Sequence, residues 1–123
     1  MSTKLSVLLV EDDPHVRLGC EQAMQLAGMP VHAVASAEEA QKRIAAGFPG
    51  VVVTDMRLPG MDGLAFIRWA HGIEAALPVI MITGHGDVTL AVEAMRSGAY
   101  DFIPKPFSSE HLVEVVQRAL EKR

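Results

Sequence analysis

The sequence predicts an α/β domain of three layers, in which helices cover both faces of a parallel sheet. Two observations support this prediction: five short apolar segments of strand length recur along the chain, and a segment with helical periodicity follows each of them. Regular alternation of strand and helix is typical of parallel sheets with right-handed crossovers. The chain has 123 residues, which suits one domain, so we expect residues 1–123 to form a doubly wound (βα)5 unit.

The predicted strands are rich in Val, Ile and Leu, and the third has almost no polar interruption, as expected of a strand covered on both faces. The five strands are predicted at Leu5–Val10, Val31–Val34, Val51–Thr54, Val79–Ile82 and Tyr100–Ile103. Half of the residues are apolar and only 5% are aromatic, so we expect an aliphatic core.

Capping residues predict where the helices begin and end. Asp13 and Pro14 are typical of an N-cap followed by proline at the first helical position, and Gly28 ends that helix. Ser36 opens a capping box, and the helix that it begins is predicted to stop near Gly47. The remaining helices are predicted through Ile67 and Trp69, over Val88–Arg96, and from Ser108 or Ser109 onward.

The composition limits the classes of function. The net charge of −4 argues against direct binding of nucleic acid by this segment, because phosphate backbones bind basic surfaces. Cys20 is the single cysteine, so no internal disulfide is possible and a reducing compartment is expected. No secretory signal opens the chain, and no apolar run approaches the length of a membrane span. We therefore expect a cytoplasmic domain without membrane contact.

Reactive side chains follow four of the five predicted strands. They are Glu11, Asp12 and Asp13 after the first strand, Asp55 after the third, Thr83 after the fourth and Lys105 after the fifth. In open parallel sheets, ligands bind beyond the carboxyl ends of the strands, so these side chains should meet. Neighbouring carboxylates raise one another's pKa unless a cation joins them, and Mg²⁺ prefers such oxygen ligands. A carboxylate beside Mg²⁺ and a lysine is arranged for in-line attack on phosphorus.

Each of these residues also has a purely structural explanation. Capping explains Asp13 better than a role in the site does. Asp55 taken alone could be a turn residue before Pro59, Thr83 could be structural, and Lys105 could be a solvated surface lysine. Their joint placement at strand ends is what favours a functional site.

Three segments of the chain carry a family resemblance that covers essentially its whole length. They read VLLVEDDPHVR, VVVTDMRLPGMDGL and VIMITGHGDVTLAVEAMRSGAYDFIPKPF. The segments resemble the two-component response-regulator receiver domain. This resemblance implies a CheY-like, flavodoxin-like sheet with strand order 2-1-3-4-5, and a phosphoryl group taken from a sensor histidine kinase.

The resemblance assigns roles to the acidic residues. It implies that Asp55 is both phosphorylated and a metal ligand, and that Asp12 binds Mg²⁺ directly, with Mn²⁺ as a possible substitute. Glu11 is expected to act on the metal through water, and the backbone carbonyl of Arg57 is expected to be a further ligand. Arg57 and His85, each two residues after a site residue, are expected to tune the lifetime of the phosphorylated state.

The resemblance also assigns a switch. Thr83 matches the hydroxyl that moves onto the phosphoryl group, and Lys105 matches the lysine that pairs with it, with a cis peptide bond expected between Lys105 and Pro106. Phe102 matches the rotating aromatic residue, which is tyrosine in many receivers. Tyr100 lies two residues earlier, so we expect it on the same strand face, where it could share the output surface.

The output follows from family likeness alone. The stretches TGHGD, AVEAM and GAYDFIPKPF are most similar to receivers of the NtrC and C4-dicarboxylate transport regulator (DctD) type. Such receivers precede an AAA+ ATPase and a DNA-binding domain, so the resemblance implies the amino-terminal module of a longer transcription activator. It also implies a homodimer through the Val88–Arg96 helix, the strand that follows it and the last helix. A FixJ-type regulator, a stand-alone receiver and a receiver of a hybrid kinase are the alternatives.

An enzyme is the remaining alternative class. Phosphatases of the haloacid-dehalogenase kind also use an aspartyl nucleophile, but they need a second aspartate two residues later, where this chain has Arg57. We therefore expect no enzymatic turnover beyond self-phosphorylation and slow autodephosphorylation.

Overall fold

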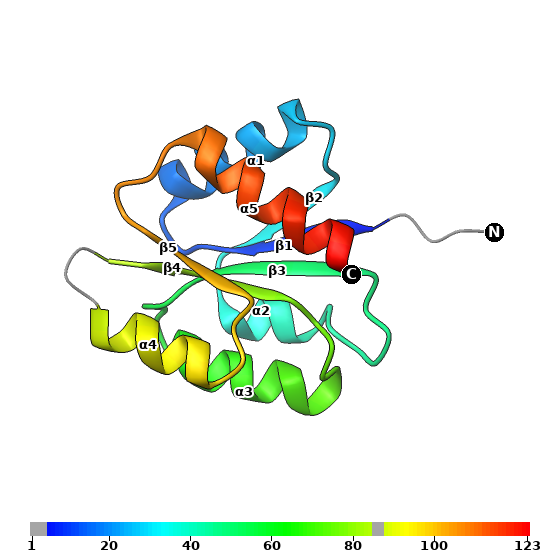
Figure 1. The fold of residues 1–123 in the computed structure, drawn as a ribbon, viewed down its shortest axis with the longest axis vertical. Helices are drawn as coiled ribbons and strands as arrows, with labels where there is room; N and C mark the ends of the chain where they lie inside the picture. The colour runs from blue at the N-terminus through cyan, green and yellow to red at the C-terminus, as the bar shows by residue number, and fades with distance from the viewer. Residues whose placement is uncertain (1–4, 85–87) are drawn as a thin grey trace.

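The computed structural model describes residues 5–84 and 88–123 as a five-stranded parallel sheet between two layers of helices (Figure 1). The strands are β1 (Ser6–Val10), β2 (Val31–Val34), β3 (Gly50–Asp55), β4 (Val79–Thr83) and β5 (Asp101–Pro104). The helices are α1 (Pro14–Leu26), α2 (Ala37–Gln41), α3 (Gly63–Ile73), α4 (Val88–Arg96) and α5 (Ser109–Lys122). The strand order is β2-β1-β3-β4-β5, and the predicted fold is confirmed.

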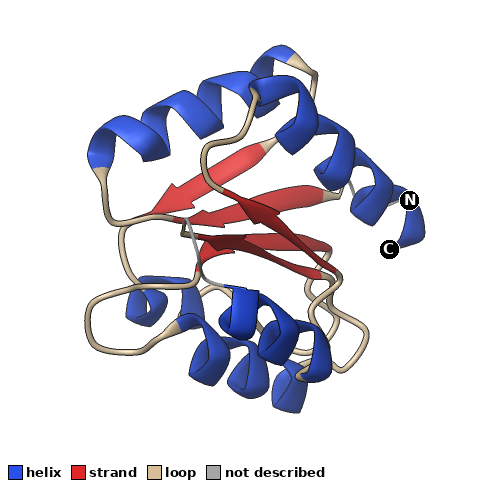
Figure 2. Ribbon diagram, turned by 60° about the vertical axis from the view of Figure 1, so that its left-hand side comes forward, coloured by secondary structure: helices blue, strands red, loops and turns tan. Residues whose placement is uncertain are grey.

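The two faces of the sheet carry separate cores, because successive side chains of a strand point to opposite faces. Helices α1 and α5 cover one face, and α2, α3 and α4 cover the other (Figures 1 and 2). Val51 and Val53 pack on the α1 and α5 side, whereas Val52 packs on the other side, among α2, α3 and α4. Every residue of β3 is buried, as the apolar run in this segment predicts.

The predicted caps of α1, α2 and α5 are present. The side chain of Asp13 accepts hydrogen bonds from the backbone amides of His15 and Val16, with Pro14 at the first helical position. Ser36 caps α2, and Ser108 caps α5. Each of these side chains satisfies amide groups that the first turn of a helix leaves without a partner.

The predicted end of the second helix is wrong. We expected this helix to run to the neighbourhood of Gly47, but α2 ends at Gln41. The amide of Arg43 bonds to the carbonyl of Ala40, three residues back, and this tighter turn replaces the α-helical pattern. Ile44 is 6% exposed, so the segment after α2 turns to bury an aliphatic side chain.

The predicted fifth strand is displaced by one residue, since β5 begins at Asp101 and includes Pro104. Tyr100 therefore precedes the strand, and the alternation of a strand does not apply to it. It packs against the core on the α1 and α5 side, whereas Phe102 packs against the core on the opposite side. The prediction that Tyr100 and Phe102 share a face is wrong.

Gly50 allows β1 and β3 to approach each other at their amino ends. A Cβ atom built on Gly50 would lie 2.0 Å from the carbonyl oxygen of Ser6 and 3.1 Å from the ring of Phe48. The first of these contacts is with backbone, so no side-chain rotation could relieve it. Within residues 5–84 and 88–123, no helix combines the length and apolar character that crossing a membrane requires.

We predict that Gly50→Ala lowers the free energy of unfolding by about 1–3 kcal/mol or more, because the new methyl group must push β1 and β3 apart. Gly19→Ala is the matched control. Gly19 lies within α1, and the space that a Cβ atom would take there is open, so alanine should raise stability by about 0.5–1 kcal/mol. Urea denaturation followed by circular dichroism measures both effects, and similar stabilities for the two variants would contradict the prediction.

Candidate functional site

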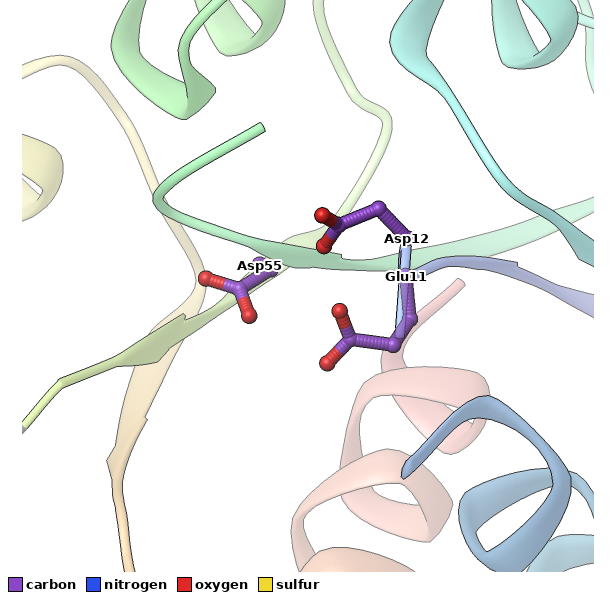
Figure 3. A group of neighbouring side chains, drawn as sticks. All are labelled: Glu11, Asp12 and Asp55. Atoms are coloured by element: carbon purple, nitrogen blue, oxygen red, sulfur yellow. The ribbon is translucent and has the colours of Figure 1, made fainter. Parts of the chain in front are cut away.

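Three carboxylates from two strand ends meet at the carboxyl edge of the sheet. Glu11 and Asp12 follow β1, and Asp55 is the last residue of β3, the strand beside it. One oxygen atom from each carboxylate lies within 4.8 Å of the other two, and the side chains point towards a shared space (Figure 3). The sequence prediction that these residues meet is confirmed.

Both carboxylate oxygens of Asp55 are bound by donors of the domain. The backbone amide of Arg57 donates to Oδ1 at 2.9 Å, and Nζ of Lys105 donates to Oδ2 at 2.8 Å. The residue is only 7% exposed, so these bonds act in surroundings of low dielectric constant. The carboxylate is therefore held in one orientation at the rim of the sheet.

Lys105 balances the negative charge of the cluster. Burial opposes its charged form, but the hydrogen bond to Asp55 and the charges of Asp55, Glu11 and Asp12 outweigh burial and raise the pKa of Lys105. Its backbone amide donates to the carbonyl of Thr83 at 2.8 Å, which ties it to the end of β4. The Lys105–Pro106 peptide bond is cis.

Glu11 is the buried member of the cluster, at 1% exposure. Its Oε2 accepts a long hydrogen bond of 3.4 Å from the amide of Asp13. Its Oε1 is buried without a hydrogen bond among the described residues and lies 3.8 Å from Nζ of Lys105. Burial above all, together with the charge of Asp55 and the carboxyl of Asp12, raises the pKa of Glu11 to about 7.

Asp12 and Asp13 differ in their surroundings although they are adjacent. Asp12 is exposed and contributes an oxygen to the carboxylate cluster. Asp13 is the N-cap of α1, and its hydrogen bonds from the amides of Val16 and His15 lower the pKa of its carboxyl. The cluster found among the described residues does not include Asp13.

The switch residues predicted from the sequence lie around β4 and β5. Thr83, the last residue of β4, is 2% exposed and pairs with Pro104 in the sheet register. Phe102 is half-buried and pairs with Met81. His85 lies outside the described residues.

Arg17 is a contributor that the sequence reasoning missed. Its Nη1 donates to the backbone carbonyl of Glu11 at 2.9 Å and approaches that of Asp12 at 3.5 Å. It thereby braces the acidic turn from the first turn of α1. The sequence shows that Arg17 lies four residues after the Asp13 cap, and therefore near the start of the helix. This spacing does not predict which carbonyl groups the arginine contacts.

The cluster has the character of a site for a hard divalent cation. All three side chains offer carboxylate oxygens, which are the ligands that Mg²⁺ prefers. Among the described residues no donor bonds to the buried Oε1 of Glu11, and a bound cation, or a water molecule on that cation, would supply the missing partner. These residues therefore fit a magnesium ion.

Comparison with known proteins identifies the family. A family model described as the response regulator receiver domain matches residues 7–117. The chain is a response-regulator receiver domain. The acidic cluster of this receiver domain lies beside the lysine at the carboxyl ends of the strands, where the sequence pattern predicted that these side chains meet.

Relatives of this receiver domain are transcription regulators by name. The C4-dicarboxylate transport transcriptional regulatory protein DctD of Pseudomonas aeruginosa is 52% identical over 95% of this chain and 25% of its own length. The DNA-binding transcriptional regulator NtrC of Escherichia coli is 38% identical over 93% of this chain and 24% of its own length. The chain spans about a quarter of the length of these relatives. The predicted likeness to the NtrC type is confirmed.

Solved structures agree with the fold of this receiver domain. The receiver domain of NtrX from Brucella abortus has a TM-score of 0.87 and 35% identity, and the match covers 96% of this chain and all of that one, at 100%. This likeness extends the sequence comparison to the arrangement of all five strands and five helices.

We predict that the metal-free receiver domain loses stability as pH rises from about 4.5 to about 7, because the pKa of Glu11 is raised from 4.5 to about 7 on folding. The folded state then binds the Glu11 proton more tightly than the unfolded state does, so deprotonation favours unfolding until pH exceeds the folded pKa. In the wild type, the ionisation of Glu11 should lower the free energy of unfolding by about 1–3 kcal/mol over this pH range. Glu11→Gln should lack this part of the pH dependence.

Urea denaturation of the wild type and of Glu11→Gln in EDTA, at several pH values, measures this difference. Five histidines also titrate in this range, so the difference between the two proteins carries the result rather than either slope alone. Equal slopes in the two proteins would show that Glu11 is not the group responsible.

Proposed function

We propose that this receiver domain accepts a phosphoryl group from a sensor histidine kinase onto Asp55. One observation carries the proposal: the Asp55 carboxylate is oriented by the Arg57 amide and by Lys105, beside two further carboxylates at the edge of the sheet. A structural acid at a turn would not need a lysine that comes from the end of another strand.

In the proposed reaction, a carboxylate oxygen of Asp55 attacks the phosphorus of a phosphohistidine. An O–P bond forms as the N–P bond breaks, and the electron pair of the broken bond returns to the imidazole nitrogen of the kinase. Lys105 now donates to Oδ2 of Asp55, so it must transfer this hydrogen bond to an oxygen of the incoming phosphoryl group. The Arg57 amide continues to hold Oδ1 and fixes the direction of attack.

Mg²⁺ is the proposed cofactor, with Mn²⁺ as an alternative. Asp12 and Asp55 would bind it directly, the backbone carbonyl of Arg57 would be a further ligand, and Glu11 would act through water. When bound, the ion would neutralise charge on the phosphoryl oxygens. Asp12 is the exposed member of the cluster, so it suits an ion that arrives from solvent.

The proposed switch couples Asp55 to the surface of α4, β5 and α5. Thr83 moves towards the phosphoryl group, and Phe102 fills the space that Thr83 leaves. Phe102 has no hydroxyl group, so packing alone must hold its inward position. Its contact with the core on the α2, α3 and α4 side of the sheet supports a role for packing in this proposed step.

The proposed output is transcription activation of the NtrC and DctD type, through an AAA+ ATPase and a DNA-binding domain beyond Arg123. The names of the relatives support this output. Homodimerisation through the surface of α4, β5 and α5 is proposed because Val88, Val92 and Met95 expose 72%, 47% and 41% of their surface on α4. A FixJ-type output, a stand-alone receiver and a hybrid kinase are distinguished by the sequence that follows Arg123.

The domain is proposed not to be an enzyme that turns over a separate substrate. Its own chemistry is limited to self-phosphorylation from a phosphodonor and slow autodephosphorylation. Arg57 follows the acceptor by two residues, near where hydrolytic water must approach, and we propose that it tunes the lifetime of the phosphorylated state. His85 is proposed to act with it. Equal dephosphorylation rates in Arg57→Ala, His85→Ala and the wild type would exclude this role.

We predict that Asp55→Asn abolishes labelling by a small phosphodonor such as acetyl phosphate, because the amide is a poor nucleophile. Asp62→Asn is the matched control. Asp62 is exposed on the loop that follows Asp55, where it caps α3, and asparagine is an equally good cap. Intact mass spectrometry should find one phosphoryl group per chain in the wild type and in Asp62→Asn. Undiminished labelling of Asp55→Asn would disprove the assignment of the acceptor.

We predict that millimolar Mg²⁺ raises the melting temperature of the wild-type domain, because a ligand of the folded state alone stabilises it by mass action. Asp12→Asn should reduce this rise several-fold, whereas Asp62→Asn should keep it. Differential scanning calorimetry with and without EDTA measures the shifts at constant ionic strength. A rise of the same size in Asp12→Asn would indicate that the ion binds elsewhere.

A further inference from the structure

The guanidinium group of Arg123 fastens the carboxyl end of α5 to the body of the domain. Its Nη2 donates to the carbonyl oxygen of Phe48 at 2.6 Å and to Oε2 of Glu74 at 2.9 Å, and its Nε donates to the carbonyl oxygen of Gly50 at 3.1 Å. The Arg123 side chain is 13% exposed and that of Glu74 is 23% exposed. One side chain therefore joins α5 to the start of β3 and to the residue that follows α3.

These contacts differ from an ordinary surface ion pair. Arg118 and Glu114 form such a pair on the same helix, four residues apart, with side chains 63% and 54% exposed. Pairs of this kind contribute little to stability. Arg123 instead reaches acceptors 49 to 75 residues away in the sequence. Its planar donor group can bind several acceptors at once, which a lysine cannot do in the same geometry.

The pKa of Glu74 reflects its contact with Arg123. The hydrogen bond from Arg123 is the main cause that lowers the pKa of Glu74, with a smaller contribution from the amide of Gly47. Glu74 is also the C-cap residue of α3, and its own amide bonds to the carbonyl of Ala70. The partner of Arg123 is therefore itself anchored to a helix end.

The contact lies at the end of the sheet where the strands begin, whereas Asp55 lies at the end where they finish. Gly50 is the first residue of β3 and Asp55 is the last, so the two lie roughly 17 Å apart at about 3.3 Å per residue. Figure 1 shows the carboxyl end of α5 beside the start of β3. A segment attached to Arg123 would begin at this far edge, away from the acidic cluster.

We propose that Arg123 is a latch that fixes the carboxyl end of α5 to β3 and α3, and so sets the direction in which a following segment leaves the domain. The latch makes the end of α5 a rigid support. A change at Asp55 would then reach a following segment through movement of the domain body or of a partner surface, and not through fraying of α5. The inference does not require phosphorylation of Asp55.

Hydrogen exchange of the 123-residue chain tests the latch, with Arg123→Ala and Glu74→Ala as the disrupting variants and Glu114→Ala as the matched control. Loss of the latch should raise the exchange rates of the amides of Ala119, Leu120, Glu121 and Lys122 on the order of ten-fold, by local opening of the last turn. The amides of Val51–Val53 report global unfolding and should change much less. Glu114→Ala should leave the last turn as protected as in the wild type.

Arg123→Lys adds a second measurement that does not depend on removing the charge. It keeps the positive charge but lacks the planar donors, so its exchange rates should lie between those of the wild type and Arg123→Ala. Initial rates of labelling by acetyl phosphate should be the same in all these variants, because the latch is remote from Asp55. Wild-type protection of the last turn in Arg123→Ala, or equal deprotection by Glu114→Ala, would overturn the latch.

Discussion

The hydrogen bond between Lys105 and Asp55 joins residues 50 positions apart, and the arrangement of the carboxyl edge depends on it. Three carboxylates gather there, one of them almost completely buried, and their mutual repulsion opposes the fold. Lys105 supplies the positive charge that offsets this repulsion, while its backbone amide fixes it to the end of β4. The same residue thus stabilises the acidic cluster and ties β5 to the strand that ends in Thr83.

Aliphatic side chains cover both faces of the sheet and exclude water from the strands that lead to the acidic cluster. Residues 51–53 of β3 are fully buried, and Asp55 stands where the strand emerges. Low dielectric surroundings strengthen every charge interaction at this point, and they also make an incompletely paired group such as Glu11 costly. Stability alone would favour an uncharged residue at this position, because burying the Glu11 carboxylate costs free energy. A cation bound by the cluster would offset that cost.

Most of the fold could be predicted from particular sequence signals. Apolar runs predicted five strands, and Asp13, Ser36 and Ser108 predicted three helix starts, because caps act over a few neighbouring residues. The end of α2 was missed because the turn at Arg43 depends on burying Ile44, which is a tertiary contact. Tyr100 was assigned to the wrong face because β5 begins one residue later than predicted, at Asp101, so the alternation of a strand does not apply to Tyr100.

The sequence by itself determined the order of strands and helices, the acidic residues at the strand ends and the resemblance to receiver domains, because each depends on local spacing. Only the tertiary structure decided which oxygen of Asp55 faces Lys105 and that Arg17 contacts the backbone of the acidic turn. It decided that Glu11 is buried with one oxygen that has no hydrogen bond among the described residues. It also decided that Arg123 reaches Gly50, 73 residues away in the chain. Such contacts arise from the packing of helices on the sheet, and no short-range pattern encodes the distance between side chains on different elements.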